Sequence, residues 1–383
     1  MEGPKVTPWE VQIKTEEDYK RLIELFGVKP LTNELKERLK ELTGELHLLI
    51  RRDFYYAHRD LDLVINDVEE GKGFFLYTGI APSKGSMHIG HLVPFILTQW
   101  FQEKFGANVY IMFPDEEKYW AKKVDSVKEV QEKIRNIHAR FIAALGFDPD
   151  KTFMFMDSEY IKQLYSAAIP IARRINISTA KSVFGFSGDT SIGLVFYVAL
   201  QIAPTFFEEK RPLIPCGIDQ DPYFRVQRDI APSLGGYKTA DILSKMVWGL
   251  KGPYTKMSAS DPESAIFVTD DYETVKRKIF KYAFSGGQPI LELHRKLGGN
   301  PNIDVSFFWL KILFEPDDKK LKELEDSYRN GELTTGELKE YTIKKIWEFL
   351  EPLQKRAKKI NIDKYFYEGK LAQEMWNWKF PLP

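Results

Sequence analysis

The feature that most constrains this fold is a strand, a helix and a second strand that follow one another between residues 73 and 113. The segments GFFLYTG (73–79) and ANVYIMF (107–113) are short, apolar and aromatic, and each predicts a buried strand. Between them, HLVPFILTQWFQEKFG (91–106) has the length of a helix and ends in glycine. Strands joined by such a helix lie parallel, so the chain is expected to form an α/β fold.

Further segments repeat this alternation. KTFMFMD (151–157) and PLIPCGID (212–219) predict two more strands, and Asp221 is expected to cap a helix that has Pro222 at its first position. Alternating units of this kind predict a Rossmann-like, doubly wound parallel sheet within residues 71–265.

Helical patterns flank the predicted sheet on both sides. LTNELKERLKELTG, residues 31–44, places leucines on one face and stops at a glycine, so residues 1–70 are expected to be a helical extension. A capping box from Thr334 to Glu337 opens a long amphipathic helix. It lies in a predicted helical domain of residues 266–383.

Composition narrows the class of protein. The 383 residues carry 55 Lys and Arg against 55 Asp and Glu, so any nucleic-acid contact must use a local basic surface. The single cysteine, Cys216, cannot form an internal disulfide. No apolar run approaches the roughly 20 residues of a membrane span. We expect a cytoplasmic protein without a membrane partner.

Two histidines, His88 and His91, follow the first predicted strand and bracket Gly90. A zinc site needs three or four ligands, and no HExxH or cysteine cluster accompanies this pair, so no structural metal is expected. Ordinary packed or exposed histidines are a second interpretation. Position favours a third, phosphate binding, because open α/β sheets bind ligands where a strand turns into a helix.

Two motifs carry a family resemblance. HIGH, residues 88–91, resembles the first signature of class I aminoacyl-tRNA synthetases, and KMSAS, residues 256–260, resembles the second. With YTG (77–79), DEEKYW (115–120) and IDQDPYFR (218–225), the chain is similar over nearly its whole length to tryptophanyl-tRNA synthetases of archaea and eukaryotes.

That resemblance implies an activity. The chain would activate L-tryptophan with ATP, release pyrophosphate, and transfer the tryptophanyl group to the 3′ end of tRNA(Trp). It implies Mg²⁺ as the partner of ATP, an anticodon-binding role for the helical domain, and a homodimer formed through an insertion at about residues 115–205.

The resemblance also assigns single residues, whose expected task is to position and neutralise phosphate rather than to form a covalent bond. The expected catalytic residues are His88, His91, Lys256 and Ser258. The expected ATP site adds Pro82, Ser83, Gly90, Asp219 and Met257. The expected tryptophan site consists of Tyr77, Met112, Glu117, Gln201 and Gln220.

Met112 departs from the family pattern. Relatives carry a glutamine there that helps Tyr77 to hold the indole nitrogen, whereas a thioether packs well and is a poor hydrogen-bond partner. Ile80 also replaces a usual arginine, and Pro114 interrupts the stretch before Glu117. A synthetase for tyrosine or another aromatic amino acid therefore stays an alternative.

A basic run in the predicted helical domain, QKRAKK (354–359), is the expected contact for tRNA. Charge runs on helices usually face solvent, and only the resemblance favours anticodon contact. Two further alternatives are a small-molecule nucleotidyltransferase and a synthetase-like RNA-binding protein without catalysis. The intact signature motifs favour an active synthetase. The basic residues concerned are Lys355, Arg356, Lys358 and Lys359.

Overall fold

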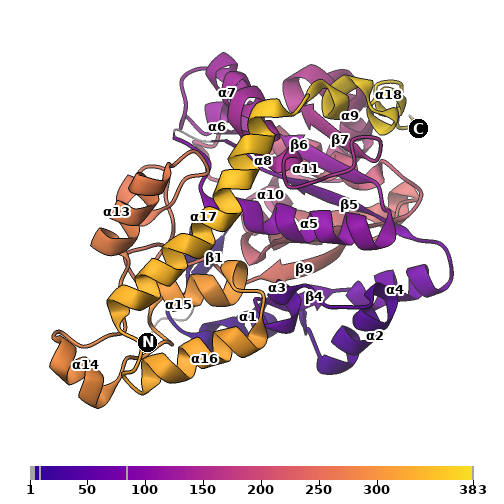
Figure 1. The fold of residues 1–383 in the computed structure, drawn as a ribbon. Coiled ribbons are helices and arrows are strands. Elements are labelled where there is room, and N and C mark those ends of the chain that lie inside the picture. Colours follow the sequence, from indigo (N-terminus) through magenta and orange to yellow (C-terminus); the bar gives the residue numbers. More distant parts are fainter. Residues whose placement is uncertain (1–4, 8–9, 83–84, 382–383) are drawn as a thin grey trace.

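Seven strands form the central sheet of the computed structural model, which describes residues 5–7, 10–82 and 85–381 (Figure 1). Their order is β3-β4-β9-β8-β5-β6-β7. Neighbours from β9 to β7 pair in parallel, and β3 and β4 are antiparallel at one edge. The strands are β3 (Lys29–Pro30), β4 (Tyr55–Arg59), β5 (Phe74–Gly79), β6 (Val109–Phe113), β7 (Thr152–Met156), β8 (Arg211–Gly217) and β9 (Ala240–Ser244).

Successive side chains of the parallel strands point to opposite faces of the sheet and enter two separate cores. Leu76 and Ile111 belong to the core on one face, and Tyr77 and Tyr110 belong to the core on the other. Helices cover both faces, with α5 (Leu92–Phe105) in front of the sheet in Figure 1. The predicted doubly wound α/β fold is confirmed.

The helices divide according to the core that their side chains enter. The core with Leu76 receives α2 (Asn33–Thr43), α3 (Leu48–Arg51), α4 (Leu61–Glu69), α5 and α8 (Ala139–Ala143). The core with Tyr77 receives α1 (Glu16–Phe26), α9 (Asp157–Ala172), α10 (Ile177–Phe184), α11 (Ile192–Ile202), α12 (Asp221–Ile230) and α18 (Lys370–Met375). Short helices α6 (Glu117–Trp120) and α7 (Val127–Lys133) follow β6. Within the described ranges, no helix is long and apolar enough to cross a membrane.

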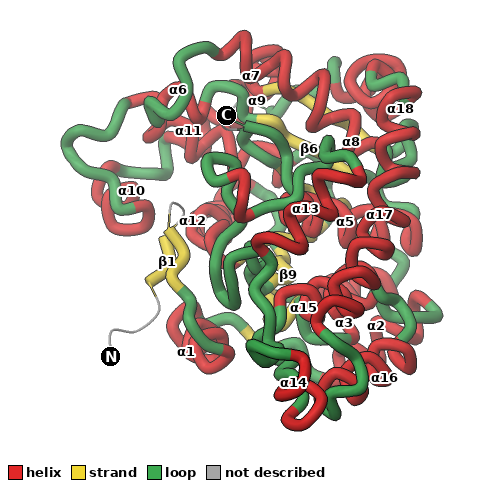
Figure 2. The backbone as a smooth tube through the Cα atoms, turned by 60° about the vertical axis from the view of Figure 1, so that its left-hand side comes forward, coloured by secondary structure: helices red, strands yellow, loops and turns green. Residues whose placement is uncertain are grey.

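The segment before residue 70 is more than the helical extension that its leucine pattern predicts. It contains α1 to α4, but also an antiparallel pair, β1 (Lys5–Thr7) with β2 (Glu10–Gln12), which lies beside α1 (Figure 2). Strands β3 and β4 come from the same segment and join the main sheet through the pairing of β4 with β9. The N-terminal segment and the sheet are therefore built together.

The helix after β8 starts one residue earlier than the sequence predicts. Asp221 is its first residue, and Gln220 occupies the N-cap position. The Asp221 carboxylate is fully buried and accepts a hydrogen bond from the Arg59 guanidinium, with 2.6 Å between Oδ1 and Nε. The capping role predicted for Asp221 was wrong, because an arginine from the distant strand β4 takes up its carboxylate.

A third core holds the region after residue 265 together. Trp309 lies within it and donates its indole N–H to the Trp248 carbonyl at 2.9 Å. The same core includes Ile89 and Met257 from the two signature motifs. The region is helical as predicted, whereas the limits of the domains stay a prediction. Its helices are α13 (Tyr272–Tyr282), α14 (Leu291–Leu297), α15 (Val305–Trp309), α16 (Asp318–Arg329) and α17 (Thr335–Lys359).

Helix α17 runs from this region back to the sheet (Figure 1). The predicted capping box is present at its start. Near its end, the Arg356 guanidinium donates to the Ala144 carbonyl at 2.8 Å, which ties α17 to the segment after α8. The C-terminal helix α18 then packs against α9, where the Tyr160 hydroxyl donates to the Met375 carbonyl at 2.7 Å.

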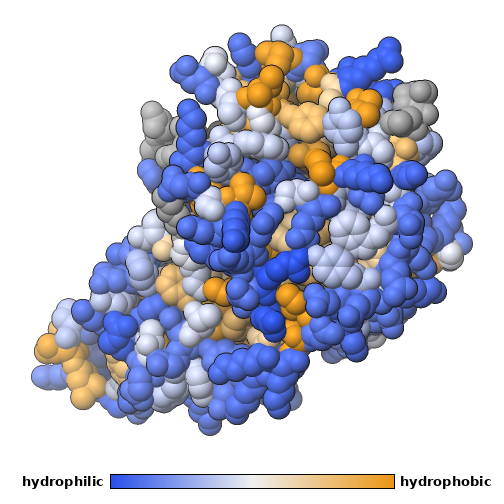
Figure 3. All heavy atoms as spheres, turned by 90° about the horizontal axis from the view of Figure 1, so that it is seen from above, coloured by the Kyte–Doolittle hydropathy of each residue, from blue (hydrophilic) through white to orange (hydrophobic). Residues whose placement is uncertain are grey.

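The surface of the helical region has one apolar end. Most of the face seen in Figure 3 is hydrophilic, and an apolar cluster marks its left-hand end, where α14 lies. Leu291 and Leu297 are 61% and 62% exposed there. This end of the molecule therefore presents apolar side chains to solvent.

Candidate active site

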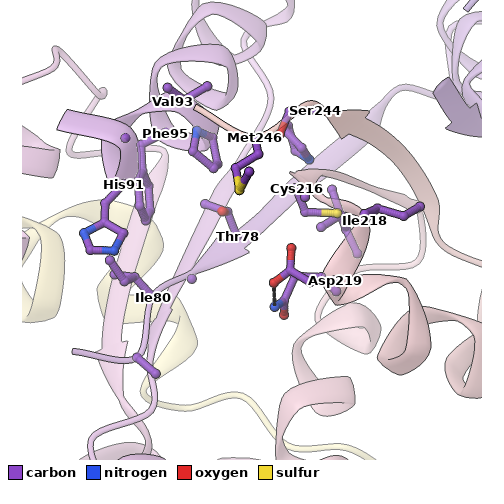
Figure 4. Close-up of a pocket in the computed structure, with 18 of the residues that line it drawn as sticks. Thr78, Ile80, His91, Val93, Phe95, Cys216, Ile218, Asp219, Ser244 and Met246 are labelled. Carbon is purple, nitrogen blue, oxygen red and sulfur yellow. Dashed lines mark hydrogen bonds between the residues drawn. The ribbon is translucent and has the colours of Figure 1, made fainter. Parts of the chain in front are cut away.

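The candidate site lies where the direction of strand connection reverses. The chain passes from β5 to β6 on one side and from β8 to β9 on the other, although β5 and β8 are neighbours in the sheet. Open α/β sheets bind ligands at such a switch point, outside the carboxyl ends of the strands. A cavity of about 460 Å³ opens there. In Figure 4, His91 and Ile80 face it from one side and Asp219 from another.

The two histidines of the HIGH motif stand together on the wall of this cavity. Their rings are stacked, with centroids 3.5 Å apart and 19° between planes. The backbone N–H of His88 donates to Nδ1 of His91 at 3.3 Å. Since this nitrogen is an acceptor, a neutral His91 ring carries its proton on Nε2.

Both histidines are held neutral. Burial, and then the Lys256 ammonium, lower the pKa of His88 to about 3. Burial, and then the neighbouring His88, place the pKa of His91 well below its ordinary value. Near pH 7 each ring therefore has a single N–H, and the geometry gives His91 an N–H donor at Nε2.

The KMSAS loop meets the HIGH segment at this cavity. Lys256 and Met257 line it together with His88, Gly90 and His91. A Cβ added to Gly90 would lie 3.3 Å from the sulfur of Met257, so the glycine permits close packing of the two motifs. The two signature motifs, predicted to converge, are brought together.

Backbone pairing holds this meeting in place. The Ile89 N–H donates to the Ile266 carbonyl at 3.0 Å, and the Val268 N–H donates to the Met87 carbonyl at 2.9 Å. The segment that contains HIGH is thus bonded to the segment that follows the KMSAS loop.

Tyr77 and Met112 line the cavity on the side of β5 and β6. Tyr77 is only 1% exposed, and its hydroxyl donates to the Gln201 backbone carbonyl at 2.9 Å. The sulfur of Met112 lies 2.9 Å from the same hydroxyl. Because the one phenolic proton is directed to a carbonyl, the hydroxyl meets a ligand as a hydrogen-bond acceptor.

Strand register explains how Met112 reaches Tyr77. Gly79 of β5 is the partner of Met112 on β6. A Cβ added to Gly79 would lie 2.6 Å from the Met112 carbonyl oxygen, so the glycine lets the two strand ends approach. Tyr77, two residues earlier, then lies on the same face as Met112.

The remaining polar residues predicted for tryptophan also line the cavity. Glu117 pairs with Lys118 at 2.8 Å. The side-chain oxygen of Gln201 accepts from the Tyr197 hydroxyl, which leaves its amide N–H groups as donors. The Gln220 amide donates to Asp219 at 2.9 Å.

Other predicted residues lie elsewhere. Neither Pro82 nor Ser258 is among the described residues that line the cavity, and Ser83 lies outside the described part of the chain. The Ser258 hydroxyl bonds with that of Ser260 at 2.9 Å, within its own loop. In the basic run, Arg356 donates to the Ala144 carbonyl, and Lys355 pairs with Glu351 at 2.9 Å.

Several residues that line the cavity belong to no recognisable sequence motif. Lys118 and Lys123 add positive charge beside Lys256. Burial, and then the Lys118 ammonium, lower the pKa of Lys123. Tyr19 from α1 and Met246 after β9 also line it. No motif marks these residues, because only the packing of distant segments brings them together.

Carboxylates are few in the described cavity wall. Only Glu117 and Asp219 supply them there. Among the residues that the structure describes, no group of three or more His, Cys, Asp and Glu side chains could hold a metal ion.

Comparison with known proteins assigns this arrangement to a family. The family model for tRNA synthetases class I (W and Y) matches residues 69–351. That span contains both signature loops and most of the residues that line the cavity, so the chain belongs to the class I aminoacyl-tRNA synthetases. The tryptophan–tRNA ligase of Saccharolobus solfataricus is 54% identical over 373 residues, which are 97% of each chain. Within the class, the chain thus belongs to the tryptophan–tRNA ligases, which join tryptophan to tRNA using ATP.

Solved structures agree with this membership. The tryptophanyl-tRNA synthetase of Giardia lamblia superposes with a TM-score of 0.87 at 36% identity, covering 92% of this chain and 97% of that one. The enzyme of Encephalitozoon cuniculi bound to tryptophan gives 0.84 at 35% identity, with 92% and 97% coverage. The alternatives of a small-molecule nucleotidyltransferase and of a tyrosine enzyme are thereby set aside.

Proposed function

We propose that the cavity performs both steps of tryptophan–tRNA ligation: attack of the tryptophan carboxylate on the α-phosphorus of ATP, and transfer of the tryptophanyl group to tRNA(Trp). The observation that carries this proposal is that HIGH and KMSAS residues, remote in sequence, line one cavity. In-line phosphoryl attack mainly requires positioning and charge neutralisation, and the cavity offers groups for both.

The phosphates are assigned to the side of the cavity with the histidines. His91 directs an N–H donor at Nε2, and Lys256 supplies a cation next to it. Lys118 and Lys123 add positive charge on the same wall. Donors and cations placed where charge develops stabilise the transition state more than the bound substrate.

The tryptophan side chain is assigned to the opposite side. Its indole N–H would donate to the Tyr77 hydroxyl, which is available as an acceptor because its own proton goes to the Gln201 carbonyl. The ammonium group would meet the Glu117 carboxylate. In this arrangement Met112 packs against Tyr77 and does not replace the missing glutamine amide.

Mg²⁺ is assigned to the phosphates of ATP. With Glu117 assigned to the tryptophan ammonium, Asp219 is the carboxylate of the described cavity wall that could assist, which suits an ion that keeps most of its waters and takes few protein ligands. When bound, Mg²⁺ would neutralise part of the charge on the leaving pyrophosphate.

The tRNA is assigned to the helical region after residue 265. Lys358 and Lys359 are exposed in the last turn of α17, and Lys355 is exposed one turn earlier. Arg356 has a packing contact, so its share in tRNA binding is expected to be smaller.

A homodimer is assigned to the insertion between β6 and β8. On α9, Ile161, Tyr165 and Ile169 are spaced by four residues and are 39%, 53% and 40% exposed, which makes one apolar stripe. Ile192 of α11 is 89% exposed. Sedimentation of the parent and of a Tyr165→Glu variant tests this: a dimeric parent and a monomeric variant are expected.

The activity is tested by ATP–pyrophosphate exchange with a panel of amino acids, followed by charging of purified tRNA(Trp). Exchange that depends on tryptophan, with transfer to tRNA(Trp), is expected. Exchange with tyrosine instead, or none at all, would contradict the proposal. Since the reaction supplies the ribosome, we assign the enzyme to the cytoplasm.

A further inference from the structure

The N-terminal helix α1 reaches the candidate active site, although its sequence carries no catalytic motif. Tyr19 of α1 is 3% exposed and lines the cavity. The wall that it touches is the segment 244–247, which leaves the carboxyl end of β9 beside β8 and lines the same cavity as Asp219. This is the side away from β6 and Met112, where the tryptophan side chain is assigned.

Three contacts fasten α1 to this wall. The Tyr19 hydroxyl accepts the backbone N–H of Met246 at 2.9 Å. The Lys245 ammonium pairs with Glu16 at 2.6 Å and lies 5.5 Å from the centre of the Tyr19 ring. The ring itself packs edge-on against Tyr56 of β4, with centroids 5.0 Å apart. Tyr19 is thus fixed by the sheet on one side and holds the wall segment on the other.

The same wall segment leads directly to the KMSAS loop. Trp248 and Lys256 form an antiparallel bridge, and the Gly249 N–H donates to the Thr255 carbonyl at 2.7 Å, so residues 248–256 make a hairpin. Tyr254 on this hairpin packs against the core that contains Tyr19 of α1. Burial, and then the Glu16 carboxylate, raise the pKa of Tyr254. Displacement of the wall at Met246 would therefore move the base of the loop that carries Lys256.

We infer that Tyr19 is a positioning residue for ATP: by accepting the Met246 N–H, it holds the wall from residue 244 to the KMSAS hairpin in the conformation that receives the nucleotide. This inference rests on the proposed assignment of the two sides of the cavity. Tyr19 acts through the wall, and Glu16 supports it by holding Lys245. The tryptophan side, built on β5 and β6, does not depend on this contact.

The test compares Michaelis constants in tryptophan-dependent ATP–pyrophosphate exchange. Tyr19→Phe keeps the ring and removes only the acceptor of the Met246 N–H. Loss of one such hydrogen bond is expected to raise KM for ATP about three- to tenfold, and KM for tryptophan should be unchanged, since no bond on its side is changed. Glu16→Gln, at a carboxylate that is 60% exposed, should raise KM for ATP by a smaller factor, about twofold.

A matched control separates this role from a loss of stability. Tyr365 is also buried, and its hydroxyl bonds to a backbone carbonyl, that of Phe147, at 2.9 Å, but it does not line the cavity. Tyr365→Phe should lower the melting temperature and leave both Michaelis constants unchanged. If Tyr19→Phe behaves like this control, or raises both constants equally, the inference is overturned.

Two further outcomes are defined. Should Tyr19→Phe fail to fold, Glu16→Gln decides the matter: a selective rise in KM for ATP supports the inference, and an unchanged value overturns it. An inactive parent enzyme would instead contradict the proposed function, so the two failures are distinguishable.

Discussion

Replacement of Tyr77 by phenylalanine tests how this enzyme selects tryptophan when the neighbour of the Tyr77 hydroxyl is the thioether of Met112. The phenol is buried, and its only proton is donated to the Gln201 carbonyl. The substitution keeps the ring and its edge-on contact with Phe224, whose centroid lies 6.3 Å away. What is lost is the acceptor proposed for the indole N–H.

The size of the effect follows from that missing acceptor. A buried N–H left without a partner costs about 1–3 kcal/mol. Since 1.4 kcal/mol is a factor of ten, kcat/KM for tryptophan should fall about 5- to 150-fold. The Gln201 carbonyl also loses its donor, but it does so in the free and the bound enzyme alike. The Met112 sulfur is too weak an acceptor to restore the difference.

The assay is ATP–pyrophosphate exchange with tryptophan and with an analogue in which sulfur replaces the indole N–H. The parent should prefer tryptophan over the analogue by about the same factor as that by which Tyr77→Phe lowers kcat/KM for tryptophan, because either change deletes the same hydrogen bond. The Tyr77→Phe variant should hardly distinguish the two substrates. If the variant keeps the parent's preference, another group holds the indole N–H, and the argument from the direction of the Tyr77 proton is refuted.

Three further predictions concern charge. Lys256→Ala should lower the single-turnover rate of adenylate formation about 10²-fold or more, as expected for a lost transition-state contact, and an unchanged rate would exclude that role. His58 has its pKa lowered to about 4, mainly by burial, and accepts the Leu61 N–H. Between about pH 4 and pH 6.5, the unfolded chain therefore binds more protons at this histidine than the folded chain does. The urea midpoint should fall as the pH drops through this range, and His58→Asn should make that fall shallower. A variant whose midpoint changes with pH in parallel with that of the parent would contradict this. Finally, alanine is introduced at the four basic residues of α17, which are Lys355, Arg356, Lys358 and Lys359. The salt dependence of tRNA binding should then become shallower, and equal slopes for variant and parent would exclude this surface.

Much of the fold and the centre of the site could be predicted from sequence because the signals are local. The strand from Phe74 to Gly79 and the helix that ends before Gly106 follow from apolar runs and a glycine stop. Likewise, HIGH and KMSAS are short motifs, and each can be recognised from a few consecutive residues. Both motifs were expected at one cavity, and they line it together.

Contacts between distant segments could not be predicted in this way. Aspartate is a residue type that often caps helices, so Asp221 was expected to be a cap. Its partner is instead Arg59, which reaches it because β4 lies beside β9. Nothing near Lys123 in the sequence indicates that it faces the same cavity as Lys256. Side chains of this kind are positioned by strand order and helix packing, which sequence periodicity does not encode.

The sequence by itself therefore determined the class of fold, the two signature motifs and the chemistry that they indicate, because each depends on neighbours along the chain. Only the tertiary structure decided that Tyr77 is a hydrogen-bond acceptor and that α1 holds a wall of the cavity. Both facts depend on backbone groups, the Gln201 carbonyl and the Met246 N–H. Every residue carries such groups, so their direction becomes specific only when distant segments pack against one another.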